Sequence, residues 1–190
     1  MGAIGSGEFG MDDLALRIER IEAESQIRQL VARYCFTIDD RDLEGLASLY
    51  TDSARMRSAD GVMDAIGLDA IMDMWRDRFA ALGPGQHFTH DLVIDEINLA
   101  AGTARGRVSS HAEVERNGIS MIGAVRYYDE YRRTTDGWKF AERLLRFLYY
   151  VPVSRYDGIL GERHRNLAYA EPKLADFPEA LPGWNAFHRE

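Results

Sequence analysis

The fold is decided by residues 103–134, which read TARGRVSSHAEVERNGISMIGAVRYYDEYRRT. Apolar and polar residues alternate through this stretch, and Asn117-Gly118 interrupts the alternation near its middle. A period of two is typical of a half-buried strand, and Asn-Gly is the dipeptide that best fits a tight hairpin turn. The stretch therefore predicts two antiparallel strands, 103–116 and 119–134, joined at Asn117-Gly118.

The same alternation continues on both sides of this hairpin. It covers residues 87–99, which precede Ala101-Gly102, and residues 137–150, which follow Asp136-Gly137. Each of these glycine-containing dipeptides is a hairpin-type turn signal. Three successive turns of this kind predict a four-stranded antiparallel meander.

Upstream of the meander the apolar residues have helical spacing. They recur every three or four positions over 12–37, 42–50 and 68–82, and residues 53–65 predict a short hairpin. Asp42 is the predicted N-cap of the second helix, and Gly83-Pro84-Gly85 closes the third. Helices followed by a meander predict an α+β domain, with N-terminal helices packed on a curved, mostly antiparallel sheet.

The two ends of the chain differ from this domain, which is expected to cover residues 11–150. Residues 1–10 have neither the basic start nor the apolar stretch of a signal peptide, so they are interpreted as an added leader before a natural start at Met11. Residues 151–190 contain Pro152, Pro172, Pro178 and Pro182 among recurring aromatic residues, which predicts an irregular tail. That tail could pack on its own domain, cover the mouth of a pocket or contact a neighbouring subunit.

Composition argues against several classes of protein. The chain has 190 residues, 46% of them hydrophobic and 28% charged, as expected for one soluble globular domain. A net charge of -8 without a Lys/Arg cluster disfavours nucleic acid as a partner. The sequence has no apolar run of about 18 residues, so no membrane span is expected. The single cysteine, Cys35, permits no intrachain disulfide and favours a reducing, cytoplasmic location.

Motifs for metals and cofactors are not found. The acidic cluster at 39–42 lacks the spacing of a calcium loop, and His87, His90 and His111 lack the His-Glu-x-x-His spacing of zinc enzymes. Neither a Gly-x-Gly-x-x-Gly nor a phosphate-loop pattern occurs, and Gly-x-Ser-x-Gly is also absent. We therefore expect no bound metal and no cofactor.

Asp39 and His87 are the leading catalytic candidates. Asp39 stands where the first helical pattern ends, and His87 opens the first strand of the meander. A carboxylate that holds an imidazole in one tautomer makes that imidazole a usable general base near neutral pH. The pair therefore indicates proton abstraction without a cofactor.

Strand alternation sorts the remaining polar candidates by face. His87 and His90 lie on opposite faces if their strand is regular. A convergence of His87, His111 and Tyr127 on the concave face would give a ligand pocket a polar floor. Arg143 and Arg146 also fall on opposite faces of the last strand, so only one of them can reach the cavity directly.

Four segments resemble the SnoaL-like branch of the nuclear-transport-factor-2-like superfamily. They are Ile27-Arg-Gln-Leu-Val-Ala-Arg-Tyr34, residues 39–52, Gln86-His87-Phe88 and Asp136-Gly137-Trp138-Lys139-Phe140. The resemblance covers about residues 20–150 and implies a cone-shaped α+β barrel. In motif it is greatest to cofactor-independent lyases, namely scytalone dehydratase, bile-acid 7α-dehydratase, hexachlorocyclohexane dehydrochlorinase and the lyase that releases formaldehyde from lignin-derived diaryl compounds.

This resemblance implies roles for individual residues. It carries an Asp–His dyad onto Asp39 and His87, and it adds Tyr34 and His111 as further catalytic groups. Together with the strand and helix patterns, it leads us to expect that substrate contacts come from Tyr127, Arg146, Trp75 and Met121. Ile38 and Ser58 stand where scytalone dehydratase has tyrosines, which argues against scytalone as the substrate.

The expected function is a cofactor-independent lyase that acts by general acid–base catalysis. Its substrate would be a hydrophobic aromatic or polycyclic small molecule, such as a lignin-derived aromatic, from which it eliminates water, halide or formaldehyde. The alternatives are an isomerase or cyclase of the same fold, a non-catalytic ligand-binding module, and a partner that resembles the small subunit of ring-hydroxylating dioxygenases. A homotrimer or homodimer is also expected.

Overall fold

The computed structural model describes residues 11–169 and 171–188, and the predicted leader, residues 1–10, lies outside the described residues. The first half contains α1 (Met11–Asp39), α2 (Leu43–Ser48), β1 (Tyr50–Ser58), β2 (Asp64–Ile66) and α3 (Leu68–Ala81). The meander contains β3 (Leu82–Asn98), β4 (Thr103–Arg116), β5 (Ile119–Thr134) and β6 (Gly137–Pro152). The tail contains the short 3₁₀ helices η1 (Val153–Arg155) and η2 (Ile159–Gly161), and then α4 (Pro182–Phe187).

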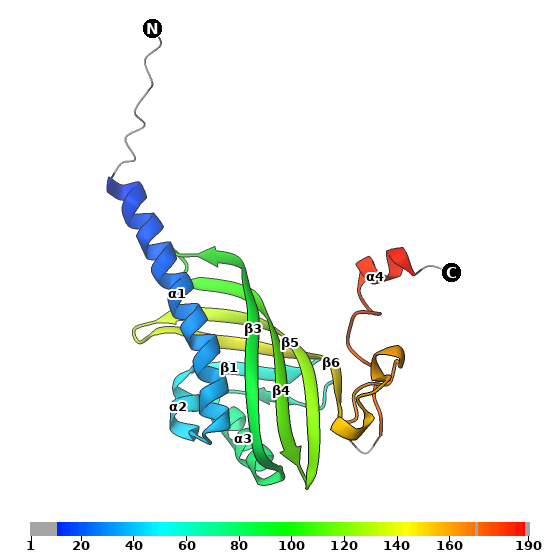
Figure 1. Ribbon diagram of the computed structural model, residues 1–190. Helices are drawn as coiled ribbons and strands as arrows, with labels where there is room; N and C mark the ends of the chain where they lie inside the picture. The colour runs from blue at the N-terminus through cyan, green and yellow to red at the C-terminus, as the bar shows by residue number, and fades with distance from the viewer. Residues whose placement is uncertain (1–10, 170, 189–190) are drawn as a thin grey trace.

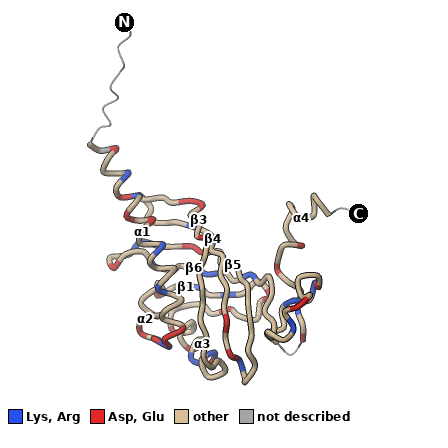
Figure 2. Tube along the Cα trace, in the orientation of Figure 1, with Lys and Arg blue, Asp and Glu red and all other residues tan. Residues whose placement is uncertain are grey.

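One curved, unclosed sheet holds all six strands in the order β2-β1-β6-β5-β4-β3 (Figure 1). The pairs within the meander are antiparallel, as is β1 with β2, whereas β1 runs parallel to β6. The predicted α+β class and the mostly antiparallel curved sheet are therefore confirmed. Acidic and basic residues are interspersed along the strands (Figure 2).

The long helix α1 divides into two parts that differ in burial. Its second part packs against the sheet through a buried stripe, whereas its first part extends beyond the sheet in Figure 1. The stripe consists of Ile27, Leu30, Val31, Tyr34, Cys35 and Ile38. The exposed first part includes Leu14, Leu16, Ile18 and Ile21. The second part of α1 is thus the one that reaches the interior of the cone.

The turn after α1 attaches its end to the start of β3. Arg41 has a φ of 60°, and its Nη2 donates to the backbone oxygens of Leu82 at 3.0 Å and Gly83 at 2.5 Å. Asp42 caps α2 as predicted, since its side chain accepts a hydrogen bond from the backbone of Gly45 at 2.8 Å. Gly83-Pro84-Gly85 ends the helical pattern as expected, but the chain passes directly into β3 there instead of forming a loop.

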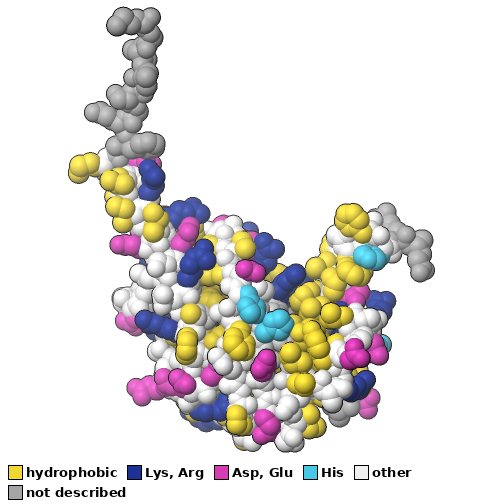
Figure 3. Space-filling view, viewed as in Figure 1, with side chains coloured by type: hydrophobic (Ala, Val, Ile, Leu, Met, Phe, Trp, Pro, Cys, Tyr) yellow, Lys and Arg dark blue, Asp and Glu magenta, His cyan; other side chains and the backbone are white. Residues whose placement is uncertain are grey.

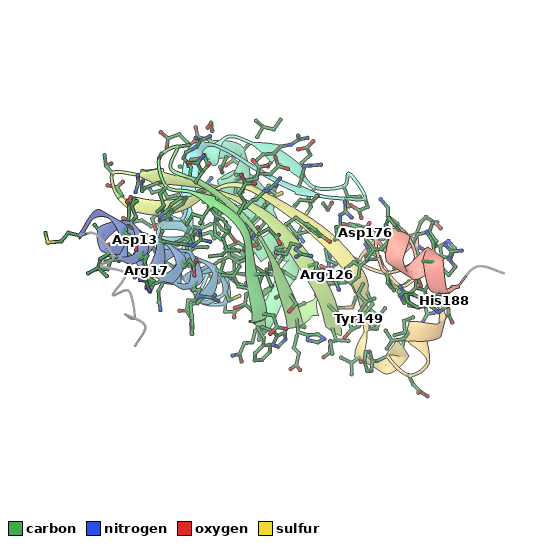
Figure 4. The ribbon with its side chains drawn as sticks, turned by 90° about the horizontal axis from the view of Figure 1, so that it is seen from above. Asp13, Arg17, Arg126, Tyr149, Asp176 and His188 are labelled. Carbon is green, nitrogen blue, oxygen red and sulfur yellow. The ribbon has the colours of Figure 1, made fainter. Side chains whose placement is uncertain are left out.

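The tail returns to the end of β6 and contacts its own domain. The backbone of Tyr150 exchanges hydrogen bonds with Arg165 and Leu167, and the backbone N–H of Phe147 donates to the Asp176 carboxylate at 2.7 Å. Figure 4 shows Asp176 near Arg126 of β5, whose guanidinium carbon lies 4.4 Å from the ring centroid of Phe177. These contacts hold the tail against the sheet at the end opposite the free part of α1 (Figure 1).

Arg165 is the main anchor of the tail. Its guanidinium is buried and donates to the backbone oxygens of Leu148, Glu162 and Phe177 and to both oxygens of Glu179. Hydrogen bonds of this charged kind are each worth about 1.5–3 kcal/mol. The Arg165 guanidinium also holds the pKa of the Glu179 carboxyl below its usual range.

We expect Arg165→Met to release the tail without unfolding the sheet. Amide hydrogen exchange measured by mass spectrometry should speed up by about 10-fold or more in peptides covering residues 160–180, because one charged anchor is worth that factor. Peptides covering 103–134 should be unchanged, and Arg163→Met, at an exposed position two residues away, is the matched control. Equal exchange in both variants would show that Arg165 does not hold the tail.

Within the described residues, no helix combines the length and the apolar character that crossing a membrane requires.

Candidate active site

Asp39 and His87 form the dyad that the sequence predicts. The Asp39 Oδ1 lies 2.7 Å from the His87 Nδ1, and the Asp39 Oδ2 accepts a hydrogen bond from the His87 backbone N–H at 2.9 Å. Both side chains are largely buried, with 15% of His87 and 17% of Asp39 exposed. Two bonds to one carboxylate fix both the position and the ring orientation of the histidine.

Nδ1 is the imidazole nitrogen that carries a proton in this arrangement, because the carboxylate beside it can only accept. The other nitrogen, Nε2, has no hydrogen-bond partner within the described part of the chain. A neutral imidazole with a free Nε2 lone pair is a general base. The local fold explains the geometry, since Asp39 is the last residue of α1 and Arg41 holds the following turn on β3.

His87 lines a small cavity between the concave face of the sheet and α1 and α3. Its volume is about 60 Å³. Its lining is mostly apolar and aromatic, and it includes Tyr34, Trp75, Tyr127, Phe147 and Tyr150. Three of the predicted site residues besides His87, namely Tyr34, Trp75 and Tyr127, are therefore brought together around it.

Tyr34 and Tyr127 are fully buried in this cavity wall. Their ring centroids lie 6.0 Å apart at a steep angle, and the Tyr34 centroid lies 6.2 Å from that of Trp75. Burial raises the pKa of both phenols well above the usual tyrosine value. Both hydroxyls therefore keep their protons at neutral pH, so they can donate hydrogen bonds but cannot serve as bases.

Arg143 lies beneath the two tyrosines. Its guanidinium carbon is 4.0 Å from the Tyr34 ring centroid and 4.2 Å from that of Tyr127. It also makes two hydrogen bonds to Asp129, and both of these side chains are fully buried. Arg143 is thus the arginine of β6 that faces the interior, although the tyrosine rings separate it from the cavity.

The expectation that Arg146 contacts a substrate in this cavity was wrong. Its guanidinium carbon lies 4.9 Å from the ring centroid of Tyr128, which is the neighbour of Tyr127 and faces the other side of the sheet. The side chains of adjacent strand residues point to opposite faces. Arg146 is therefore on the outer face, as Arg143 is on the inner one.

His111 is also on the outer face, so its predicted place beside His87 was wrong. Its Nδ1 lies 3.1 Å from the Nε2 of His90, and its Nε2 lies 2.9 Å from the Tyr149 hydroxyl. In the pairing of β3 with β4, His87 stands opposite Ala112, and it is Ala112 that lines the cavity. Figure 3 shows histidine side chains together on this exposed sheet face.

Met121 is buried beside the cavity but does not line it. It packs with Ala112 and Val114, two residues that do form the cavity wall. Met121 is the β5 partner of Val114, so it lies beside the cavity wall on the same sheet face, and its position does not support the prediction that it contacts a substrate directly.

Two cavity residues with polar side-chain groups, Arg78 and Tyr150, were missed by the sequence reasoning. Arg78 lies one turn after Trp75 on α3, and that i, i+3 spacing is the signal that could have placed it on the same face. Tyr150 faces the cavity because a register shift between Ala124 and Val125 sends Tyr149 to the outer face. A bulge of this kind leaves no clear mark in the alternation.

A second hollow, of about 300 Å³, flanks the dyad on the outer side of α1. Its lining includes Cys35, Phe36, Asp39, Gln86 and His87. The dyad therefore lies between the inner cavity and an open surface depression.

Burial raises the pKa of the Cys35 thiol to about 11. Because only the thiolate reacts with alkylating reagents, this shift should slow labelling near pH 8 by about 100-fold relative to an ordinary cysteine. The rate should rise as the pH approaches the raised pKa. Iodoacetamide labelling followed by mass spectrometry, with the urea-unfolded chain as the control, tests this. Equal labelling rates in the folded and unfolded chain would contradict it.

No three His, Cys, Asp or Glu side chains converge on a possible metal position among the residues that the structure describes. Two of the acidic residues near the end of α1 have other roles, since Asp39 binds His87 and Asp42 caps α2.

Comparisons with known proteins agree with this fold. The SnoaL-like domain family matches residues 19–144. The sequence matches no protein of curated function.

Solved structures with the same fold include enzymes. A hexachlorocyclohexane dehydrochlorinase from Novosphingobium barchaimii is 20% identical, with a TM-score of 0.65, over 73% of this chain and 95% of that one. A scytalone-dehydratase-like protein from Novosphingobium aromaticivorans is 20% identical, with a TM-score of 0.66, over 72% and 91%. A Mycobacterium tuberculosis protein of unknown function is 27% identical, with a TM-score of 0.59, over 80% of each chain.

Proposed function

This chain belongs to the SnoaL-like family, and we propose that it is a lyase that uses no cofactor and acts on a hydrophobic, aromatic small molecule. The observation that carries this proposal is the dyad: Asp39 binds both the ring and the backbone of His87, and His87 borders a cavity lined by aromatic side chains. A purely structural histidine has no need of a free Nε2 at the edge of such a cavity.

In the proposed reaction the Nε2 of His87 takes a proton from a substrate carbon. The electron pair of that C–H bond forms the new carbon–carbon double bond, and the leaving group departs with the electrons of its own bond. Asp39 stabilises the imidazolium that forms, as a buried carboxylate does beside a catalytic histidine. Halide leaves as the anion, whereas a departing hydroxide takes the proton from the His87 imidazolium and leaves as water.

In the release of formaldehyde, His87 again removes one proton from the substrate. The base takes the proton from a hydroxymethyl oxygen, the carbon–carbon bond to that group breaks, and its electron pair expels a neighbouring hydroxyl as the double bond forms. The imidazolium returns the proton to that hydroxyl, which leaves as water. In each version Tyr34 and Tyr127, whose raised pKa keeps them protonated, donate hydrogen bonds to the oxygen or halogen where negative charge develops.

The size of the cavity limits the substrate. A volume of about 60 Å³ is below the few hundred Å³ of a typical small-molecule site. Lining side chains must therefore move when a substrate enters, and a single aromatic ring needs less movement than a polycyclic system. Among the substrates predicted from the sequence, a monocyclic one is favoured.

The same small volume favours a second candidate, a ligand-binding or partner module without catalysis, because the chain's own side chains, several of them aromatic, leave only about 60 Å³ between them. An isomerase or cyclase would use the same dyad without expelling a group. The mass of the product separates these three functions. A lyase gives a product of lower mass than the substrate, an isomerase gives one of the same mass, and a binding module gives no product.

The test incubates the wild type and His87→Ala with hydroxylated and halogenated aromatic compounds, without added metal or nucleotide. Mass spectrometry should detect loss of water, halide or formaldehyde with the wild type alone. A product of unchanged mass would establish the isomerase instead. Turnover that His87→Ala retains in full would remove His87 from the mechanism, and binding without turnover would favour the non-catalytic module.

The homo-oligomer expected from the sequence stays a prediction. Light scattering coupled to size-exclusion chromatography measures it directly, and a mass of one chain, 21.6 kDa, would contradict it.

A further inference from the structure

Two arginines lie at the mouth of the cavity that holds His87. Arg78 of α3 lines the cavity, with its guanidinium carbon 5.8 Å from the Trp75 ring centroid. Arg116, at the end of β4, has its guanidinium carbon 6.0 Å from the ring centroid of Tyr150, which also lines the cavity. Both arginines are half-buried. Two cations, one from helix α3 and one from the end of strand β4, thus lie near the same apolar space.

Neither guanidinium has an ion-pair partner among residues 11–169 and 171–188. The hydrogen bond of the Arg78 side chain runs from Nη1 to the Met63 sulfur at 2.7 Å, and a thioether is a weak acceptor. By contrast, Arg76, two residues earlier on the same helix, pairs with Asp73 at 2.5 Å. In a chain of net charge -8, an unpaired and half-buried arginine at a cavity indicates a missing anion.

The neighbouring carboxylates are engaged elsewhere. Asp60 accepts hydrogen bonds from the Ser58 hydroxyl, the Val62 backbone at 3.1 Å and the Asn166 amide at 3.4 Å. Glu115 accepts a hydrogen bond from the backbone of Gly118. The two cations are therefore not neutralised by the acidic groups next to them.

Tyr150 lies next to both arginines: it lines the same cavity as Arg78, and its ring centroid is 6.0 Å from the guanidinium carbon of Arg116. Burial raises the pKa of Tyr150, and Arg116 and Arg78 both oppose that shift. Burial also raises the pKa of the tail residue Tyr169 to about 12, and the same two arginines oppose that shift as well. One small anion placed near Tyr150 would lie within the field of both cations.

We propose that Arg78 and Arg116 bind a carboxylate on the substrate, so that the substrate class is an aromatic carboxylic acid. The ring of this acid would contact Trp75, Tyr34 and Tyr127, and its carboxylate would stay at the cavity mouth beside the two arginines. Guanidinium groups suit this task because their planar N–H donors match the two oxygens of a carboxylate. This assignment rests on the proposed function, because it names the substrate class of the same site.

The test compares two probes of nearly equal shape, 3-phenylpropanoate and 3-phenylpropan-1-ol, by isothermal titration calorimetry. The wild type should bind the acid at least about 10-fold more tightly than the alcohol, since a charge-assisted hydrogen bond is worth that factor or more. Arg78→Gln and Arg116→Gln should each lose about 10-fold for the acid and show little change for the alcohol. Arg78→Lys should retain part of the preference.

The matched control is Arg76→Gln, which removes the same charge from the same helix at an exposed position, and it should keep the full preference. Equal binding of acid and alcohol by the wild type would overturn the proposal without any variant. So would a preference that survives both glutamine variants. Tighter binding of 3-phenylpropyl phosphate than of the acid would overturn the assignment to a carboxylate.

The result is separable from the test of the lyase. Binding is measured in the wild type and again in His87→Ala, which keeps both arginines. An arginine-dependent preference together with no turnover of any acid would leave this proposal standing and remove the lyase. Turnover of neutral compounds together with no preference for acids would support the lyase and remove the proposed carboxylate site.

Discussion

Replacement of His87 by alanine is expected to lower kcat/KM for the proposed elimination by about 10²–10⁴-fold, the usual contribution of a positioned general base. The loss should appear mainly in kcat, because the imidazole contributes to proton transfer more than to binding of the apolar ring. The protein should stay folded, since the His87 side chain lies at the edge of the cavity and keeps 15% of its surface exposed.

Asp39→Asn should produce a large part of the same loss. An amide can still accept one hydrogen bond, but it carries no charge to stabilise the imidazolium, and it can present its NH₂ group to the ring instead. Because the two residues act as one unit, the double variant should be little worse than His87→Ala alone. Strictly additive losses would show that Asp39 acts on the reaction independently of His87.

The matched controls remove the same chemical groups at positions away from the dyad. His90→Ala removes an imidazole from the same strand but from the outer face, where it contacts His111. Asp77→Asn removes one negative charge at an exposed position of α3. Both should keep near wild-type kcat/KM in initial-rate measurements. A His87→Ala enzyme that matches His90→Ala in kcat/KM would exclude the dyad from catalysis.

The dyad could be predicted from the sequence because each of its members stands at a boundary. In the sequence pattern Asp39 ends a helical period and His87 begins an alternating one, although the strand itself starts earlier, at Leu82. The hairpin turns at Asn117-Gly118 and Asp136-Gly137 were predictable for the same reason. What connects Asp39 to His87 across 48 positions is the Arg41 turn, and the local pattern does not contain that contact.

The wrong placements have a different physical cause. Alternation says that His111 and Ala112 face opposite ways, but which of them faces the cavity depends on the register with β3, a long-range property. The same holds for Arg143 and Arg146 on β6. Tyr150 was missed because the pairing with β5 shifts register between Ala124 and Val125, and this shift reverses the alternation near the end of β6.

The largest effect on stability is expected at the buried ion pair of Arg143 and Asp129. The Arg143 Nε and Nη2 donate to the two Asp129 oxygens at 2.9 and 2.7 Å, and neither side chain has any exposed surface. The Tyr131 hydroxyl donates to the same carboxylate at 2.9 Å. Removing one charge leaves the other buried without a partner, which typically costs about 3–5 kcal/mol.

We therefore expect Arg143→Met and Asp129→Asn each to lower the free energy of unfolding by about 3–5 kcal/mol in urea titrations. The control is the bidentate pair of Arg55 and Asp64, which has similar distances but is exposed at the surface. Arg55→Met should stay close to wild-type stability because solvent screens that pair. Similar losses at both sites would show that burial does not determine the effect.

The double variant Arg143→Met/Asp129→Leu separates two contributions to the free energy of unfolding. One is the net contribution of the ion pair, and the other is the cost of leaving one charge buried without a partner. It should be more stable than either single variant, because apolar side chains of similar size leave no buried charge behind. Its activity should nevertheless fall, since the Arg143 guanidinium packs at 4.0 and 4.2 Å against the rings of Tyr34 and Tyr127. A stable double variant with full activity would show that Tyr34 and Tyr127 need no cation beneath them for catalysis. A double variant less stable than both single variants would show that the ion pair itself stabilises the fold.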